Sequence, residues 1–249
     1  MNIRMPPLPR RENLLNNVYF CKAMIPRRFV IGDIHGAYKA LVQCFEKARF
    51  DPDTELLICL GDVCDRWPEV DKVIDALLKI KHLVMLLGNH DLWALEWFKG
   101  GKARDLWLAQ GGRDTMVSYA KGIPNSHLQL LQNARLYFML ENKLFVHGGY
   151  RPDSEIMHQP KELLLWDRSL VQSALYYKGL QNEIKLTGFE EVYVGHTPTL
   201  NFGTTHPIKA CEVYLMDTGA GWPGGVLTMM DIDSKEYFQS ETNTNLYYA

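Results

Sequence analysis

The chain has 249 residues, of which 47% are hydrophobic and 22% charged, and its formal net charge is −2. This length and composition are typical of a single globular domain, and the nearly balanced charge gives no electrostatic reason to expect a nucleic-acid partner. No segment approaches the ~20 apolar residues of a membrane span, and the N-terminus lacks the apolar core of a signal peptide. We therefore expect a cytoplasmic protein without a membrane partner.

The first 26 residues differ from the rest of the chain. The stretch MPPLPRREN (5–13) has the proline and charge content of an unstructured arm. We expect an N-terminal arm over 1–26 and one catalytic domain over 27–249. Two alternatives remain: a docked arm anchored by Val18, Tyr19 and Phe20, and a translation start at Met24.

From residue 28 onward, short apolar runs alternate with helical patterns, the βαβ order of a parallel sheet. Helical apolar spacing is found in the first half at 37–49, 69–80 and 91–99, then in interrupted form at 104–134, and again at 161–178. Strands near 212–217 and 225–231 are predicted to form a hairpin around GWPGG. The order of elements predicts an α/β fold, an αββα sandwich of two mixed sheets flanked by helices.

Five apolar runs end in residues that bind metals or phosphates. They are FVIGDIHG (29–36), LLICLGDVCDR (56–66), LVMLLGNHD (83–91), LFVHGG (144–149) and VYVGHT (192–197). Such runs indicate buried strands, and ligands bind beyond the carboxyl ends of strands in α/β sheets. A single Gly-Asp after a strand is usually only a turn, but five independent turns would not all carry ligands. If the strands share one sheet region, the side chains that converge are Asp33, His35, Asp62, Asn89, His147 and His196.

This set of side chains predicts a metal centre. Imidazole, carboxylate and amide groups without thiolate suit Mn, Fe or Zn. Six ligands fit two ions if one carboxylate is shared, and Asp62, on the second strand, is the natural bridge. Two ions roughly 3.5–4 Å apart would clamp the attacking and leaving oxygens of a phosphoryl displacement and activate a water. The predicted chemistry is phosphoester hydrolysis, with Mn as the first expectation and Fe or Zn as alternatives.

The motifs GDIHG, GDVCDR, GNHD, VHGG and GHT occur in the order and at the approximate spacing of the motifs of the calcineurin-like metallophosphoesterases. The chain resembles the bacterial and phage-type serine/threonine phosphoprotein phosphatases of that superfamily over about 28–232. LWDRS (165–169) and DTGAGWPGGVLT (217–228) are similar to two further segments of this branch. The resemblance implies the metallo-dependent phosphatase fold and a phosphoprotein, phosphopeptide or small phosphoester as substrate.

The resemblance also implies a role for each matching residue. One ion would be held by Asp33, His35 and Asp62, and the other by Asp62, Asn89, His147 and His196. Metal-bound hydroxide would attack the phosphorus directly.

Four residues beside the ligands would complete the machinery. His90 would act as general acid and Asp65 would orient it, since an imidazole beside a carboxylate has a fixed tautomer and orientation. Arg66 and Arg168, with Asn89, would bind the substrate phosphate, because a guanidinium can bind two oxygens at once. The alternative for each arginine is a surface ion pair with the aspartate that precedes it.

One position departs from the family pattern. The motif continues Asp-Arg-Gly, and here Trp67 replaces the glycine. If that position requires a positive φ, tryptophan is costly there, and the placement of Arg66 would change; Trp67 could instead form an aromatic wall of the substrate cleft.

Several chemically reactive residues match no motif. Asp217 is predicted to cap a turn. The remaining histidines are expected at the surface or in local hydrogen bonds: His82, His127, His158 and His206. The five cysteines have no CxxC spacing and are expected to be reduced, as in a cytoplasmic protein.

The leading functional prediction is a phosphoserine or phosphothreonine phosphatase. The alternative is a symmetrical diadenosine tetraphosphatase, which GNHD and GGRDTMVSY (111–119) favour. Asp65 favours the phosphatase, because enterobacterial-type tetraphosphatases carry Ala in that motif, whereas an exposed Trp67 could stack an adenine. The complete ligand set opposes a non-catalytic binding module. The C-x5-R spacing of Cys21 and Arg27 lacks the glycines of a cysteine phosphatase.

Overall fold

The computed structural model describes residues 26–182 and 184–248. The predicted N-terminal arm lies outside the described residues except for Pro26, so that prediction stays open. Among the described residues, no helix has both the length and the apolar character needed to cross a membrane.

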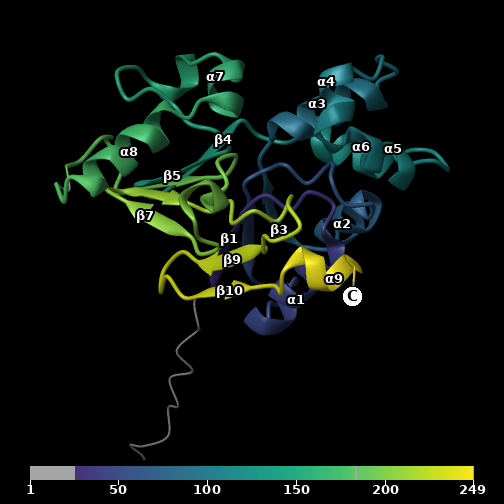
Figure 1. Cartoon of the computed structure of the whole chain (residues 1–249), viewed down its shortest axis with the longest axis horizontal. Coiled ribbons are helices and arrows are strands. Elements are labelled where there is room, and N and C mark those ends of the chain that lie inside the picture. Colours follow the sequence, from purple (N-terminus) through teal and green to yellow (C-terminus); the bar gives the residue numbers. More distant parts are fainter. Residues whose placement is uncertain (1–25, 183, 249) are drawn as a thin grey trace, which may run out of the picture.

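In the described part of the chain, ten strands form two five-stranded mixed sheets (Figure 1). The first sheet has the order β10 (Tyr237–Gln239), β9 (Thr228–Asp231), β1 (Arg28–Ile31), β2 (Leu56–Cys59) and β3 (His82–Met85). The second has the order β4 (Tyr137–Leu140), β5 (Lys143–Val146), β6 (Glu191–Val194), β8 (Val213–Leu215) and β7 (Ile208–Ala210). The three strands β1, β2 and β3 are parallel, as are β5, β6 and β8. The antiparallel pairs are β9 with β1 and β10 with β9 in the first sheet, and β4 with β5 and β7 with β8 in the second.

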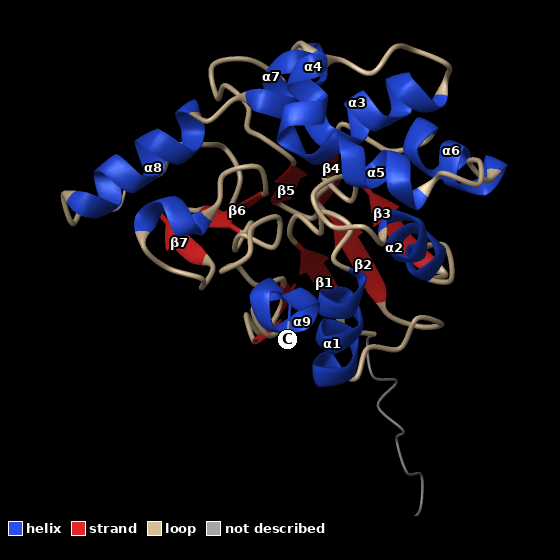
Figure 2. Ribbon diagram, turned by 45° about the vertical axis from the view of Figure 1, so that its right-hand side comes forward, coloured by secondary structure: helices blue, strands red, loops and turns tan. Residues whose placement is uncertain are grey.

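Helices cover the outer face of each sheet (Figure 2). Over the first sheet pack α1 (Tyr38–Ala48), α2 (Val70–Leu77), α3 (Asn89–Phe98), α4 (Asp105–Trp107), α5 (Arg113–Ser118), α6 (Asn125–Gln132) and α9 (Asn243–Tyr248). A π-helical turn, Leu108–Gly112, joins α4 to α5. Over the second sheet pack α7 (Lys161–Trp166) and α8 (Ser169–Gly179), and single 3₁₀ turns lie at Ile156–His158 and Thr199–Phe202. This is the predicted αββα sandwich.

The hydrophobic core has three parts, one between each sheet and its helices and one between the two sheets, and the two-residue period of the strands explains them. In β1, Phe29 and Ile31 face the helices, while Val30 faces the second sheet. Between the sheets, Phe145 on β5 stacks on Tyr193 on β6 with ring centroids 4.8 Å apart. Since alternate side chains point to opposite faces of a strand, each central strand contributes to both an outer and the inner layer.

The structure corrects two predictions about individual elements. The predicted helix at 161–178 is two helices, because Asp167 is extended at φ −68° and ψ 140° and its carboxylate accepts the Ser169 N–H at 3.0 Å. The predicted hairpin around GWPGG is wrong. Strand β8 lies in the second sheet between β6 and β7, whereas β9 pairs antiparallel with β1 in the first, so the segment between them crosses from one sheet to the other.

Candidate metal and phosphate site

The predicted ligands all lie at the carboxyl ends of five parallel strands. Asp33 and His35 follow β1, Asp62 follows β2, Asn89 begins α3 after β3, and His147 and His196 follow β5 and β6. Parallel strands place their carboxyl ends at one edge of a sheet, and the two sheets bring these edges together. All six side chains are buried, with no more than 7% of each residue exposed.

Backbone hydrogen bonds orient two of the imidazoles. Nδ1–H of His35 donates to the carbonyl of Cys64 at 2.9 Å, and Nδ1–H of His147 donates to the carbonyl of Leu60 at 2.8 Å. Each bond fixes the tautomer and turns Nε2 toward the same oxygen, Oδ2 of Asp62, at 3.8 and 3.4 Å. Nε2 of His196 is buried and has no hydrogen-bond partner within the described part of the chain. Imidazole rings held in this way are ready to ligate a metal.

The charges in the cluster suit a cation. Burial lowers the pKa of His35 to about 3 and that of His196 to about 2, so both rings are neutral at pH 7. Burial and the neighbouring Asp217 raise the pKa of Asp33 well above its usual range. Burial also lowers the pKa of His147, but the carboxylates of Asp62 and Asp33 raise it to about 10. The His147 ring therefore carries a proton that a bound metal ion would replace, because an imidazole ligates a metal only in its neutral form.

Two groups of potential ligands share one residue. The first consists of His35, Asp62 and His90, and the second of Asp62, His147 and His196, with the ligand atoms of each group within 4.8 Å of one another. Asp62 therefore stands where a bridging carboxylate was predicted. The first group contains His90, whereas the prediction from the sequence had Asp33 as the third ligand beside His35 and Asp62. The two carboxylate oxygens of Asp33 instead accept the backbone N–H of His196, at 3.2 and 3.0 Å.

Asn89 lies beside the second group. Its amide oxygen is 3.0 Å from Nε2 of His147. Its neighbour His90 donates its backbone N–H to Oδ1 of Asp62 at 2.9 Å, which fixes the start of α3 against the shared carboxylate.

Two motif glycines permit these close approaches. An ideal Cβ at Gly88 would lie 2.0 Å from Oδ1 of Asp62, and one at Gly195 would lie 2.2 Å from Oδ1 of Asp33. Any side chain at either position would displace a predicted metal ligand. Asp62 and His196 themselves have positive φ, 50° and 62°, a conformation that costs energy for non-glycine residues and is concentrated at functional sites.

Behind His90 lies a buried carboxylate that is fully hydrogen-bonded. Nδ1 of His90 is 2.6 Å from Oδ2 of Asp65, which also accepts the indole N–H of Trp107 at 2.8 Å. Oδ1 accepts the hydroxyl of Thr115 at 2.6 Å. Burial lowers the pKa of His90, but the carboxylates of Asp62 and Asp65 outweigh it, so the pKa is raised. Trp107 and Thr115 belong to no motif, and no local sequence pattern indicates their contact with Asp65.

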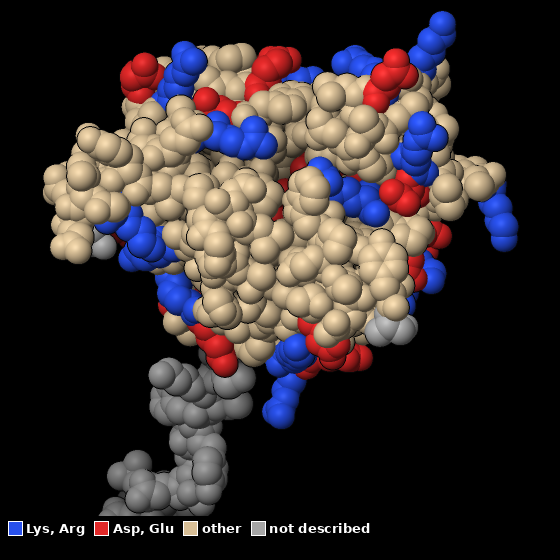
Figure 3. All heavy atoms as spheres, viewed as in Figure 1, with Lys and Arg blue, Asp and Glu red and all other residues tan. Residues whose placement is uncertain are grey.

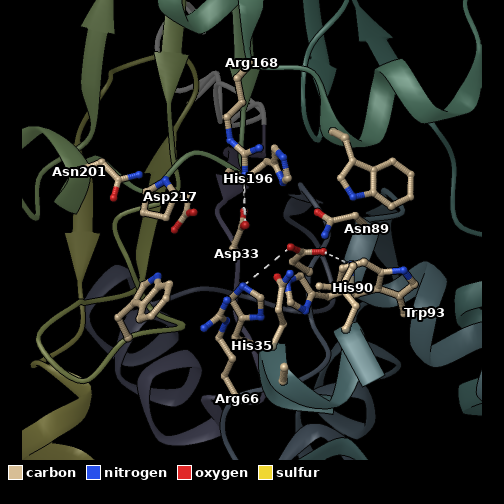
Figure 4. A pocket seen from close by; sticks show the side chains of 17 residues that line it. Asp33, His35, Arg66, Asn89, His90, Trp93, Arg168, His196, Asn201 and Asp217 are labelled. Atoms are coloured by element: carbon tan, nitrogen blue, oxygen red, sulfur yellow. Dashed lines mark hydrogen bonds and ion pairs between the residues drawn. The ribbon is translucent and has the colours of Figure 1, made fainter. Parts of the chain in front are cut away.

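The two predicted phosphate-binding arginines lie on opposite sides of the cluster (Figure 4). Nη2 of Arg168 donates to the carbonyl of His196 at 3.3 Å, and the guanidinium of Arg66 lies over the ring of Trp222 at 4.2 Å. The surface ion pairs considered from the sequence do not form, because the carboxylates of Asp65 and Asp167 are engaged by other groups.

A cavity of about 540 Å³ connects these groups. Among its lining residues are several that the sequence did not single out: Trp93, Gln110, Trp166, Pro198, Asn201 and Trp222. Asp217 also lines it; its Oδ1 accepts the Gly219 N–H at 2.9 Å, which confirms the predicted turn cap. Around the edge of the face seen in Figure 3, basic and acidic side chains are mixed.

Tryptophan at the family glycine position has no unfavourable backbone conformation. Trp67 does not have a positive φ; the positive values fall on Asp65 and Arg66, at 76° and 72°. Its indole is only 4% exposed and stacks on Tyr247, so the predicted aromatic wall is wrong at this position. Trp222, which is 45% exposed, lines the cavity instead.

The unmatched histidines behave as expected. His127 is buried and hydrogen-bonded to Tyr119 and Asp75 at 2.8 and 3.0 Å. The other three are exposed: His82, His158 and His206. Three of the described cysteines, Cys44, Cys59 and Cys64, are buried free thiols.

Known proteins are similar to this chain in sequence and in fold. Residues 26–219 match the calcineurin-like phosphoesterase family. Serine/threonine-protein phosphatase 2 of Escherichia coli is 42% identical over 77% of this chain and 87% of its own length. Serine/threonine-protein phosphatase 1 of Salmonella typhimurium is 29% identical over 82% and 91%.

A second kind of relative covers less of the chain. A symmetrical bis(5'-nucleosyl)-tetraphosphatase of Photorhabdus laumondii is 40% identical over 51% of this chain and 46% of its own length. The crystal structure of a putative diadenosine tetraphosphatase superimposes with a TM-score of 0.65 at 17% identity, over 88% of this chain and 96% of that one. On the matched sequence and the shared fold, the chain belongs to the calcineurin-like phosphoesterase family and is a metal-dependent phosphoesterase.

Proposed function

We propose that the protein is a phosphoserine and phosphothreonine phosphatase that uses two divalent metal ions. The observation that carries the proposal is the buried Asp65–His90 pair beside the shared carboxylate of Asp62. A seryl or threonyl alkoxide is a poor leaving group, so its departure depends strongly on a proton donor. A histidine held by a carboxylate at 2.6 Å is built for that task.

The nitrogen and oxygen donors of the predicted ligands fit two metal ions. One ion would be held by Asp33, His35 and Asp62, and the other by Asp62, Asn89, His147 and His196. The unpartnered Nε2 of His196 and the inward Nε2 atoms of the other two rings support this assignment. Nitrogen and oxygen donors without thiolate favour Mn, with Fe or Zn as alternatives. Bound there, the ions would polarise the phosphoryl oxygens and acidify the attacking water.

The protein residues perform the remaining steps. His90 gives a proton to the leaving oxygen, while Asp65 fixes its ring and stabilises its charged form. Trp107 and Thr115 hold the Asp65 carboxylate, so it cannot rotate away from the ring. Arg66 and Arg168, with the amide of Asn89, bind the non-bridging oxygens and offset the charge that develops on them.

The alternative substrate is a dinucleoside polyphosphate. The relatives named as tetraphosphatases support it, and so does the exposed indole of Trp222, which offers a stacking face at the cavity. Against it, a phosphate leaving group is more acidic than a seryl alkoxide and has less need of an Asp-oriented acid. We also infer a cytoplasmic location, because the buried Cys44, Cys59 and Cys64 are free thiols.

Turnover of a phosphothreonine peptide and of diadenosine tetraphosphate, measured with identical Mn loading, tests the proposal. We expect the higher kcat/KM for the peptide. The variant Asp65→Ala should lose more activity on the peptide than on the dinucleotide, because only the alkoxide depends strongly on the oriented acid. A clear preference of the native protein for the dinucleotide would overturn the substrate assignment and leave the metal site intact.

A further inference from the structure

Arg66 is positioned without an ion pair. Among the described residues, no carboxylate lies within salt-bridge distance of its guanidinium, and its Nε is buried with no hydrogen-bond partner. The guanidinium lies over the ring of Trp222, with 4.2 Å between the guanidinium carbon and the ring centroid. A long, unpaired arginine loses rotamer freedom when it binds phosphate. A contact that already restricts the arginine before binding therefore raises the affinity of the site for phosphate.

The loop that carries Trp222 presses closely on Arg66. An ideal Cβ at Gly221 would lie 2.6 Å from Cδ of Arg66 and 2.6 Å from Cδ2 of His35. A Cβ at Gly111 would lie 2.7 Å from the backbone nitrogen of Arg66, which donates to the Gly111 carbonyl at 3.1 Å. Arg66 therefore packs against two glycines, and a side chain at either position would collide with it.

The C-terminal segment fixes this loop through hydrogen bonds. The backbone N–H of Asn243 donates to the carbonyl of Gly225 at 3.0 Å. Thr244 donates both its backbone N–H and its hydroxyl to the carbonyl of Pro223, at 2.7 and 2.6 Å. These contacts join the first residues of α9 to the segment on either side of Trp222.

The carbonyl of Ala220 joins three parts of the chain. It accepts the indole N–H of Trp67 at 2.7 Å and also the side-chain amide of Asn243. Because Trp67 directly follows Arg66, the same carbonyl links the backbone of the arginine to the loop of Trp222 and to α9. Tyr247 completes the link by stacking on Trp67 at 4.6 Å. Through its hydrogen bond to Ala220, Trp67 at the family glycine position thus helps to position the loop that carries Trp222.

We propose that Trp222 is the positioning residue of Arg66, and that Asn243 and Thr244 of the C-terminal segment hold Trp222 in place. The stacked indole keeps the guanidinium pre-oriented in the cavity and leaves its N–H edge free for phosphate oxygens. This inference rests on the proposed role of Arg66 in binding phosphate. It does not depend on whether the phosphate belongs to a protein or to a nucleotide.

The test measures phosphate affinity in the Mn-loaded full-length protein. Inorganic phosphate serves as a competitive inhibitor of p-nitrophenyl phosphate hydrolysis, and the variants are Trp222→Ala and Trp222→Phe. For Trp222→Ala we expect KM and the inhibition constant of phosphate to rise about 3- to 10-fold, the range of an aromatic–cation contact. The value of kcat should change less, and Trp222→Phe should recover most of the loss because phenylalanine also presents a ring face.

A double-mutant cycle separates the loss of the Trp222–Arg66 contact from a general disturbance of the structure. In the Arg66→Ala background, Trp222→Ala should cause no further loss of phosphate affinity. Thr244→Val, which removes one hydrogen bond to Pro223, should weaken phosphate binding in the same direction but by a smaller factor. Tyr237→Ala is the matched control, since Tyr237 is similarly exposed at 41% and is not among the residues that line the cavity.

Two results would overturn the inference: an unchanged inhibition constant in Trp222→Ala, or losses from Arg66→Ala and Trp222→Ala that simply add. The failure of the proposed substrate would look different. A native protein that hydrolyses the aryl phosphate but not the phosphopeptide would refute the protein phosphatase assignment and still allow every measurement above.

Discussion

Replacing His90 by asparagine tests the acid in the proposed mechanism. The ring of His90 is 4% exposed, and its Nδ1 is 2.6 Å from Oδ2 of a fully buried Asp65. Asparagine retains a polar side chain of smaller size but cannot deliver a proton. Loss of a general acid lowers turnover roughly 10²- to 10⁴-fold, which corresponds to about 3–5 kcal/mol of transition-state stabilisation.

The loss should depend on the leaving group. For a phosphothreonine peptide, we expect His90→Asn to show the full reduction in kcat. For p-nitrophenyl phosphate the phenolate leaves without much help, so the loss should be at most about tenfold. The assay is steady-state turnover on both substrates with metal content measured for each variant, because His90 also lies within the first group of potential ligands.

A second buried histidine provides the control. His127 is 2% exposed and hydrogen-bonded to Tyr119 and Asp75, outside the cavity. His127→Asn should lower thermal stability but leave kcat per folded molecule unchanged. Equal losses on the alkyl and aryl substrates in His90→Asn, with full metal content, would refute the acid role. Loss of metal from that variant would instead identify His90 as a ligand.

Three further predictions concern the metals, pH and the core. Exhaustive chelation should abolish hydrolysis and added Mn should restore it, while Asp62→Asn should reduce the measured metal content at both sites. Burial raises the pKa of Glu191, but hydrogen bonds from Lys235, Tyr193 and Lys143 lower it below its usual range. Its stabilisation is therefore full above pH 4.5 and is lost as pH falls through the lower folded value. Glu191→Gln should cost about 1–2 kcal/mol of unfolding free energy at pH 7, and the difference in Tm from the native protein should shrink as the pH falls below 4.5; a constant difference would contradict this. Phe145→Ala should lower stability by about 3–5 kcal/mol, seen as a Tm lower by roughly 6–20 °C.

Much of the site could be predicted from local sequence. An apolar run, a glycine and then a ligand form a pattern that a single strand and its following loop determine. Because parallel strands end at one edge of a sheet, five such patterns predicted that Asp33, Asp62 and His147 would meet although they lie far apart in the chain. The buried imidazoles around Asp62 agree with that prediction.

Only the tertiary structure decided the strand pairing and the exposure of single tryptophans. Strands β8 and β9 have the spacing of a hairpin, yet β9 fills the free edge of β1 and β8 lies between β6 and β7. Likewise, nothing local distinguishes Trp67 from Trp222, but α9 covers the first and leaves the second at the cavity. Pairing and burial depend on which edges and faces remain open after distant segments have packed. A sequence window contains no information about those segments, so these features appear only in the folded chain.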